Sequence, residues 1–327
     1  MEAFSYVRAK DAGQAANAVG LGGARFIAGG TTLLDLMKLD VERPTQLVDI
    51  NRIGLDTIER LPDGRLRVGA MVRNSDFAHH AVVQEEYSVV SQALLAGASA
   101  QLRNMATTGG NLLQRTRCMY FRNTAMACNK RTPGSGCSAM EGDNRSLAIL
   151  GTSKDCIATN PSDMNVALTA LEAVVTVQGS KGSRDVPIGD FFLLPGTTPH
   201  LETVVAPGEL ITQVTLPAAR KGSKQVYLKL RDRASYEFAL SSAAIVAEVS
   251  GGKISYIRVA LGGVGTKPWR SHEAEAALLH QPAEMAVFHR AGAAAVKDAR
   301  PQSENGFKVE LTKRCVAHAL TLATQNA

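Results

Sequence analysis

Four of the five cysteines fall in one short stretch of the chain. Cys118, Cys128, Cys137 and Cys156 lie within 39 residues, separated by nine, eight and eighteen residues, whereas Cys315 stands far away. Disulfides are usually spread more widely, so a metal site or cluster is the better interpretation. The spacing contains no Cys-x-x-Cys pair, which zinc sites usually show, and lacks the compact pattern of bacterial ferredoxins. Spacing alone therefore leaves a [4Fe-4S] cluster, a zinc ion and unliganded thiols open.

The segment around these cysteines predicts a long loop-like insertion. Residues 112–155 are rich in Arg, Lys, Asn, Gly and Ser and have little apolar periodicity. Loops of this length inside a domain are usually disordered or organised by something they bind. A cluster on four thiolates carries negative charge, which six nearby basic residues could offset. These are Arg115, Arg117, Arg122, Lys130, Arg131 and Arg145.

Two glycine turns, about 80 residues apart, form a second candidate site. The first, 29–32, joins a strand-like run to a helical one, so its backbone N–H groups can approach a pyrophosphate closely. The second, 107–111, repeats the small hydroxyls and paired glycines, and Asn111 adds a donor and an acceptor. Either turn alone could be structural, but the pair suits the two phosphates of one dinucleotide. A Rossmann-type nicotinamide site is disfavoured, because Gly-x-Gly-x-x-Gly is absent.

The pattern of apolar residues along the rest of the chain predicts the strands and helices that carry these motifs. Strand-like runs at 24–28, 46–50 and 66–70 and a helical run at 89–105 surround the glycine turns. Beyond the insertion, Ser162 can cap a helix that is followed by a strand at 173–177. Strand-like runs at 211–216, 226–230, 243–249 and 254–261 precede helices from His272, from Glu284, and from Asn305 to the end. Strands followed by helices predict a separate α+β domain, with a seam near residue 220.

Composition excludes several function classes. The chain is 45% hydrophobic with no apolar run near the length of a membrane span, and its net charge of +6 comes from scattered basic residues, which disfavours nucleic-acid binding. The histidines form no ligand pattern and no Gly-x-Ser-x-Gly elbow is present, so hydrolysis is disfavoured. The first residues lack a basic-then-apolar signal, so export is expected to need a partner.

Several motifs together resemble the FAD subunits of the xanthine dehydrogenase and aldehyde oxidoreductase family of molybdenum hydroxylases. They are Ala28-Gly29-Gly30-Thr31, the run from Arg103 to Leu112, Pro161-Ser162-Asp163-Met164, and the run from Val259 to Val264. The resemblance extends essentially end to end. The insertion more narrowly resembles the [4Fe-4S]-containing FAD subunit of bacterial periplasmic aldehyde oxidoreductase, and all four cysteines are present.

The resemblance implies an α+β fold of two domains. The first, 1–219, is expected to be a two-subdomain FAD-binding domain of the PCMH/vanillyl-alcohol-oxidase type, with two α/β subdomains and the cysteine-rich insertion at about 112–157. The second, 220–327, is expected to be the α+β C-terminal domain of the CO dehydrogenase flavoprotein type. Four cysteines would hold the cluster: Cys118, Cys128, Cys137 and Cys156. FAD would be held by Phe26, Ile27, Ala28, Gly29, Gly30, Thr31, Thr32, Leu33, Leu34, Thr107, Thr108, Gly110, Asn111 and Asp163, with Ile211 and Lys229 near the adenine and flavin ends.

The resemblance also implies an electron-transfer function without a catalytic side chain. A large molybdenum-cofactor subunit would oxidise an aldehyde, a small subunit with two [2Fe-2S] clusters would relay electrons to FAD, and FAD would pass them to an external acceptor. Alternatives are the FAD subunit of a related xanthine or heterocycle dehydrogenase and a zinc-bearing, non-redox assembly subunit. No nucleic acid or membrane partner is expected. Location in the periplasm would require co-export with a signal-bearing partner; otherwise the chain would stay in the cytoplasm.

Overall fold

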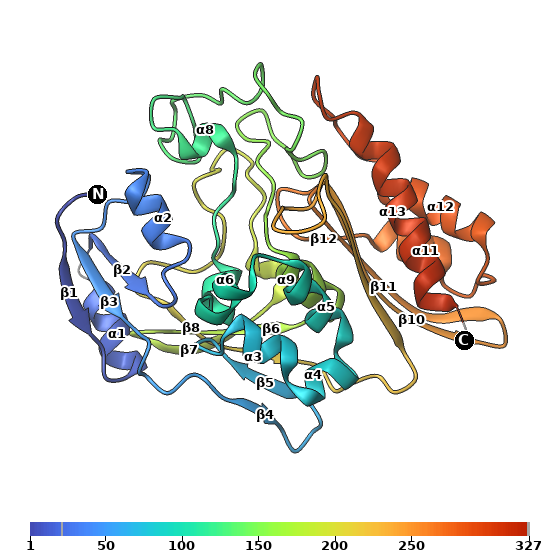
Figure 1. Cartoon of the computed structure of the whole chain (residues 1–327), viewed down its shortest axis with the longest axis horizontal. Coiled ribbons are helices and arrows are strands. Elements are labelled where there is room, and N and C mark those ends of the chain that lie inside the picture. Colours follow the sequence, from blue (N-terminus) through green and yellow to red (C-terminus); the bar gives the residue numbers. More distant parts are fainter. Residues whose placement is uncertain (21, 326–327) are drawn as a thin grey trace.

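Three separate β-sheets organise the chain (Figure 1). The structure is a computed structural model that describes residues 1–20 and 22–325. The amino-terminal sheet, the central sheet and the carboxy-terminal sheet follow one another across the molecule, and the cysteine-bearing segment rises above them. Among the described residues, none of the helices combines the length and the apolar character required to cross a bilayer.

The amino-terminal sheet is small and parallel. Its strand order is β1-β3-β2, and the helices between successive strands provide the crossovers that parallel pairing requires. Val48 at the centre of the sheet is fully buried, while all four residues of the edge strand β1 are exposed. The elements are β1 (Ser5–Arg8), α1 (Ala12–Val19), β2 (Ala24–Ile27), α2 (Leu33–Lys38) and β3 (Gln46–Asp49).

The central sheet has five antiparallel strands in the order β4-β5-β8-β6-β7. Together with helices α3, α5 and α9 it encloses the largest hydrophobic core, in which Phe77, Val89 and Phe191 are fully buried. Its strands are β4 (Ile58–Arg60), β5 (Leu66–Gly69), β6 (Val174–Gly179), β7 (Gly182–Pro187) and β8 (Leu210–Leu216). Its helices are α3 (Asn74–His79), α4 (Ala81–Glu86), α5 (Ser88–Ala96), α6 (Ala100–Met105), α7 (Thr108–Leu112), α9 (Asp163–Ala170) and α10 (Ile188–Phe191).

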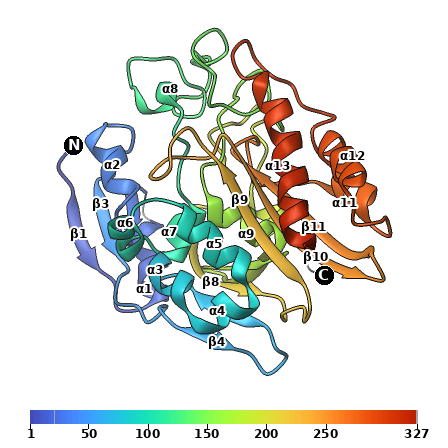
Figure 2. The ribbon, with the colours of Figure 1, turned by 45° about the vertical axis from the view of Figure 1, so that its right-hand side comes forward.

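The carboxy-terminal sheet lies between two layers of helices (Figure 2). Alternate residues of β10 point to opposite faces, so Ala244 and Val246 join the core under α5 and α9, whereas Ile245 and Ala247 join the core under α13. Both faces are therefore buried. The strand order is β12-β11-β10-β9. The elements are β9 (Lys224–Leu230), β10 (Ser241–Ser250), β11 (Lys253–Gly262), β12 (Trp269–Arg270), α11 (His272–Leu278), α12 (Met285–Ala295) and α13 (Phe307–Thr324).

Three predicted elements differ from the structure. The helical run predicted over 89–105 is broken between α5 and α6, where Ala98 has a φ of 51° and the Ser99 side chain caps α6. The second glycine turn is not an open turn, because the Thr107 side chain accepts from the N–H of Gly110 and starts the short helix α7. Of the predicted final helix, residues 305–306 precede α13, and residues 326–327 lie outside the described part of the chain.

The cysteine-bearing segment is mostly irregular, as predicted, with one short helix, α8 (Met119–Arg122). Ion pairs attach it to all three parts of the molecule. Arg122 pairs with Asp35 of α2 at 2.8 Å, Lys130 with Glu202 at 3.0 Å, and Arg145 with Asp232 beyond β9 at 2.7 Å. A segment with little regular structure is thus fixed by its side chains.

Candidate functional site

The first glycine turn presents unpaired backbone donors. It lies between β2 and α2, and Gly30 has a φ of 73°, which glycine adopts without strain. Within the described part of the chain, no protein acceptor pairs with the N–H groups of residues 29–32. Of the predicted residues 26–34 only Leu34 is exposed, and the others are half-buried. Unpaired N–H groups at a glycine turn suit an anionic group such as a pyrophosphate.

The structure brings the two glycine turns into direct contact. A Cβ atom on Gly29 would lie 1.9 Å from the carbonyl oxygen of Met105, so the backbone before the second turn presses against the first turn. No side chain fits in that space. This contact confirms that the turns lie together, and it explains why glycine is required at position 29.

The second turn differs from the first because its N–H groups are already used. Those of Thr108 and Gly109 donate to the carbonyls of Val72 and Ala70, and that of Gly110 donates to the Thr107 hydroxyl. Thr107 and Thr108 are buried, and Gly110 is exposed. Any hydrogen bond from this turn to a bound anion would therefore come from its side chains rather than from a row of free backbone N–H groups.

Asn111 connects the second turn to the start of α9. Its Oδ1 accepts a hydrogen bond of 2.8 Å from the hydroxyl of Ser162, the residue that caps α9. The next residue, Asp163, forms a buried ion pair with Lys229 of β9 at 2.8 Å, and their side chains are 9% and 4% exposed. Two predicted residues that are 66 positions apart in the sequence thus meet as charged partners.

Ile211 lies farther inside the molecule. It is 3% exposed in β8 and belongs to the central hydrophobic core. The neighbouring Thr212 accepts a backbone hydrogen bond from Ala70, whose own carbonyl accepts from Gly109 of the second turn. Ile211 is therefore close to the predicted site through the backbone of Ala70, directly after β5, but its side chain packs as a core residue.

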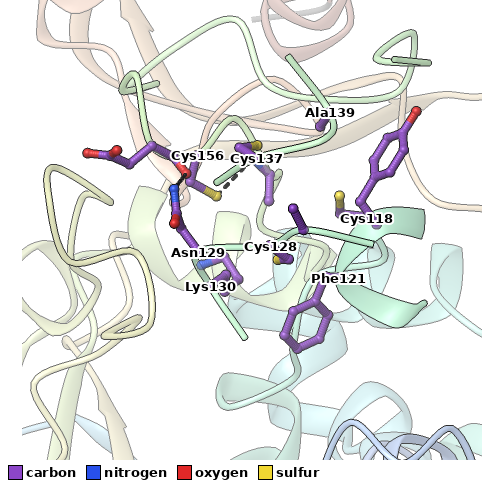
Figure 3. A pocket seen from close by; sticks show the side chains of 12 residues that line it. Cys118, Phe121, Cys128, Asn129, Lys130, Cys137, Ala139 and Cys156 are labelled. Carbon is purple, nitrogen blue, oxygen red and sulfur yellow. Dashed lines mark hydrogen bonds between the residues drawn. The ribbon is translucent and has the colours of Figure 1, made fainter. Parts of the chain in front are cut away.

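The four clustered cysteines line one cavity (Figure 3). Its free volume is small, about 10 Å³, and the other walls include Phe121, Ala139 and Ala158. Cys118, Cys128 and Cys156 are buried, Cys137 is half-buried, and all four are free thiols. A backbone bridge between Cys128 and Cys137 holds two sides of the cavity together.

The side chains that line the cavity are not gathered around a single point. In residues 1–20 and 22–325, no three side chains of His, Cys, Asp or Glu come together closely enough to hold one metal ion. A single zinc ion needs all its ligands around one point, whereas a cubane offers a different iron to each of four surrounding cysteines. Burial raises the pKa of Cys118 to about 11 and also raises the pKa values of Cys137 and Cys156. Binding of iron would therefore have to displace protons from these thiols.

The predicted basic surroundings are mostly neutralised in the structure. Arg115, Arg122, Lys130 and Arg145 are each paired with a carboxylate. Most of the six basic residues that could offset the charge of a cluster therefore also fasten the segment to acidic residues elsewhere. Among the described residues, Arg117 and Arg131 have no carboxylate partner.

Sequence reasoning missed three side chains of this region. Tyr227 is buried and donates a hydrogen bond to Asp163, and burial raises its pKa well above the usual value. Tyr227 lies two residues before Lys229 in the same strand, so both side chains point to one face of the sheet. This spacing could have indicated from the sequence that Tyr227 belongs to the region. Asn51 and Arg73 contact the backbone beside the glycine turns, and no local pattern marks them.

The residues present fit FAD. The first turn supplies free N–H groups, and a series of contacts continues through the second turn to Ser162, Asp163 and Lys229. Four distant sequence segments are thereby joined by one continuous series of contacts. An extended dinucleotide requires such a row of small, hydroxyl-bearing and charged residues, while its redox chemistry belongs to the cofactor.

Comparisons with known proteins agree with this geometry. The family described as FAD binding domain in molybdopterin dehydrogenase matches residues 2–219, and the CO dehydrogenase flavoprotein C-terminal domain matches residues 226–325. The chain is 52% identical over 334 residues to the aldehyde oxidoreductase FAD-binding subunit PaoB of Escherichia coli K12, and the alignment covers 100% of both. It is 31% identical to the glyceraldehyde dehydrogenase medium chain of Sulfolobus acidocaldarius, over 83% of this chain and 79% of that one.

A solved structure shares the whole architecture. Carbon monoxide dehydrogenase from Hydrogenophaga pseudoflava aligns with a TM-score of 0.78 and 27% identity, over 98% of this chain and 97% of the other. The similarity therefore extends over all three sheets rather than over one motif.

Proposed function

This chain belongs to the family of FAD-binding medium subunits of molybdenum hydroxylases, and from this premise we propose that it is the flavoprotein subunit of an aldehyde oxidoreductase. One observation carries the proposal at the level of residues. The glycine turns, the start of α9 and strand β9 form a continuous series of contacts that suits an extended FAD. The full-length similarity to an aldehyde oxidoreductase subunit supports the substrate class.

The work of this chain is to bind and orient the cofactor. The free N–H groups of residues 29–32 would receive the pyrophosphate, and the Asp163–Lys229 pair would lie toward the flavin end. When bound, FAD supplies a two-electron redox group that collects electrons from a partner's [2Fe-2S] clusters and gives them to an external acceptor. No side chain of this chain has to act as a general acid or base.

The proposed assembly contains two further subunits. One is a large subunit with the molybdenum cofactor, where the aldehyde is oxidised, and the other is a small subunit with two [2Fe-2S] clusters. Two similar proteins are themselves described as medium chains, which supports a multi-subunit complex. Co-expression with the two partners should yield one complex of three chains, and its elution as separate chains would contradict the assembly.

The four clustered cysteines are proposed to bind a [4Fe-4S] cluster. The support comes from the cavity that they line, because the matched family descriptions mention FAD and flavoprotein but no cluster. A cluster also gives a physical reason for an irregular segment that is held in place by ion pairs on three sides.

The test measures FAD, iron, sulfide and zinc in the anaerobically purified chain. About one FAD and four irons per chain are expected, and zinc or no metal would contradict the cluster. Cys128→Ser should remove iron and retain most of the FAD, because the cavity and the glycine turns are separate sites. Cys315→Ala is the matched control, since this cysteine is on the buried face of α13 and its replacement should leave the iron content unchanged.

Location in the periplasm is a further part of the proposal. The chain would be exported together with a partner that carries the signal, as the resemblance of its insertion to a periplasmic enzyme suggests. Cell fractionation should then find the chain in the periplasm only when the signal-bearing partner is co-expressed. A chain that remains in the cytoplasm beside an exported partner would exclude co-export.

A further inference from the structure

A chain of side-chain hydrogen bonds joins the backbones of the two glycine turns. Asn51 Nδ2 donates to the carbonyl of Ala28 at 3.0 Å, and Asn51 Oδ1 accepts from Arg73 Nη2 at 3.1 Å. Arg73 Nη1 in turn donates to the carbonyl of Met105. Ala28 directly precedes Gly29, and Met105 lies two residues before Thr107. One asparagine and one arginine thus bridge the two halves of the proposed cofactor site.

Asp49 fixes the orientation of the Asn51 amide. Its Oδ1 accepts from the Asn51 backbone N–H at 2.8 Å and from Nδ2 at 2.7 Å. Although burial opposes ionisation, hydrogen bonds from Tyr6 and Asn51 hold the pKa of Asp49 well below its usual range. The carboxylate can only accept, so the Nδ2 group must face Asp49 and Ala28, and Oδ1 must face Arg73.

The bridge holds the turns together at a contact that is unusually close. The Met105 carbonyl oxygen lies against Gly29, where any Cβ would be 1.9 Å away. Its other side accepts the hydrogen bond from Arg73. If that bond is lost, nothing else among the described side chains directs this carbonyl toward the first turn. The direction of the free N–H groups relative to Thr107 and Asn111 would then vary.

We propose that Asn51 and Arg73 are positioning residues that hold the two turns in the arrangement that binds FAD. The inference rests on the proposed function of these turns. Arginine suits this task because its planar guanidinium donates in two fixed directions, here to a side-chain oxygen and to a carbonyl. A lysine ammonium has the same charge but does not donate in these two fixed directions. The substitution Arg73→Lys therefore separates the effect of charge from the effect of positioning.

The test compares FAD affinity in the full-length chain after removal and re-addition of FAD. Arg73→Met and Asn51→Ala are each expected to weaken FAD binding by roughly tenfold, the size of effect typical of a lost charged or geometrically fixed hydrogen bond. Arg73→Lys should bind FAD as weakly as Arg73→Met. Full recovery with lysine would overturn the inference, because it would show that only the positive charge near the phosphates matters.

A double-mutant cycle checks that the two residues act through one bridge. The double variant Asn51→Ala/Arg73→Met should bind FAD about as weakly as the weaker-binding single variant, and fully additive losses would contradict a shared bridge. Melting temperatures of the FAD-free variants should stay near that of the parent, because both side chains lie at the surface or half-buried. A large drop in the FAD-free state would instead make their role one of general stability.

Two controls separate this inference from the proposed function. Arg184→Met removes an arginine that, like Arg73, donates to another side chain and to a backbone carbonyl, but on β7, and the FAD affinity of this variant should equal that of the parent. If the parent chain itself binds no FAD, the proposed function fails. If the parent binds FAD and Arg73→Met binds it equally well, only the positioning role fails.

Discussion

At the scale of single residues, Gly29 is the position where the smallest change should have the largest effect on the cofactor. A methyl group there would lie 1.9 Å from the Met105 carbonyl oxygen, and both groups are backbone-bound and cannot rotate away. Gly29→Ala should therefore force the turns apart, weaken FAD binding at least tenfold, and lower the free energy of unfolding by about 1–3 kcal/mol. FAD titration and urea denaturation measure the two effects.

Gly189 offers the matched control for this substitution. A Cβ at Gly189 would meet no atom within 4 Å, and its φ lies outside the left-handed region. Gly189→Ala in α10 should leave FAD affinity unchanged and the stability equal or slightly higher. Unchanged FAD binding by Gly29→Ala would show that the close contact between the turns does not shape the site.

At the scale of elements, local sequence patterns predicted most strands and helices but not the break after α5 or the short helix α7. The strand-like run at 243–249 and the Ser162 cap of α9 are local signals, and both are confirmed. The break after α5 depends on Ala98 in a left-handed conformation, and α7 depends on the side chain of Thr107, where glycines and threonines alone indicate a turn. Asn51 and Arg73 were not predictable, because their partners come from segments 22 or more residues away.

The irregular segment that bears the cysteines is held to α13 by a buried lysine. Lys308 is 0% exposed and donates to the carbonyls of Ser146, Leu147 and Gly263 at 2.8, 3.0 and 2.8 Å. Burial lowers its pKa from 10.5 to about 7, with a smaller contribution from Arg145. An unfolded chain would then bind more protons than the folded one between about pH 7 and 10, so this group should make the free energy of unfolding rise with pH there.

Lys308→Met tests this pH dependence. The parent should gain roughly 2 kcal/mol of unfolding free energy from this group between pH 7 and 9, and the variant should lack that gain. Below pH 7 both states of the parent carry the proton, so the two proteins should follow the same slope. Urea denaturation at several pH values measures the difference, with Lys313→Met, a half-buried lysine on the same helix, as the control. Parallel curves from pH 7 to 9 would show that the folded protein keeps Lys308 charged throughout.

At the scale of the whole molecule, the Asp163 end of the proposed site lies where the central and carboxy-terminal sheets are joined. Helix α9 belongs to the hydrophobic core of the central sheet and packs against β10 and β11, and Asp163 at its start contacts Tyr227 and Lys229 of β9 in the carboxy-terminal sheet. The same carboxylate is therefore a candidate cofactor ligand and a joint between two parts of the chain. Its two oxygens accept from different residues of β9, so the joint fixes the strand in two places.

The Asp163–Lys229 pair should stabilise the FAD-free chain as a joint, independently of any ligand. Lys229→Met would leave the Asp163 carboxylate buried with Tyr227 but without its counter-charge, and should lower the free energy of unfolding by about 3–5 kcal/mol. Adding Asp163→Asn to that variant removes the stranded charge and should restore part of the loss. Lys224→Met, at the exposed start of the same strand, should change stability by less than about 0.5 kcal/mol. Urea denaturation of the FAD-free variants measures these changes. A Lys229→Met protein as stable as its parent would show that the ion pair does not hold α9 to β9 and that its role is in binding the cofactor.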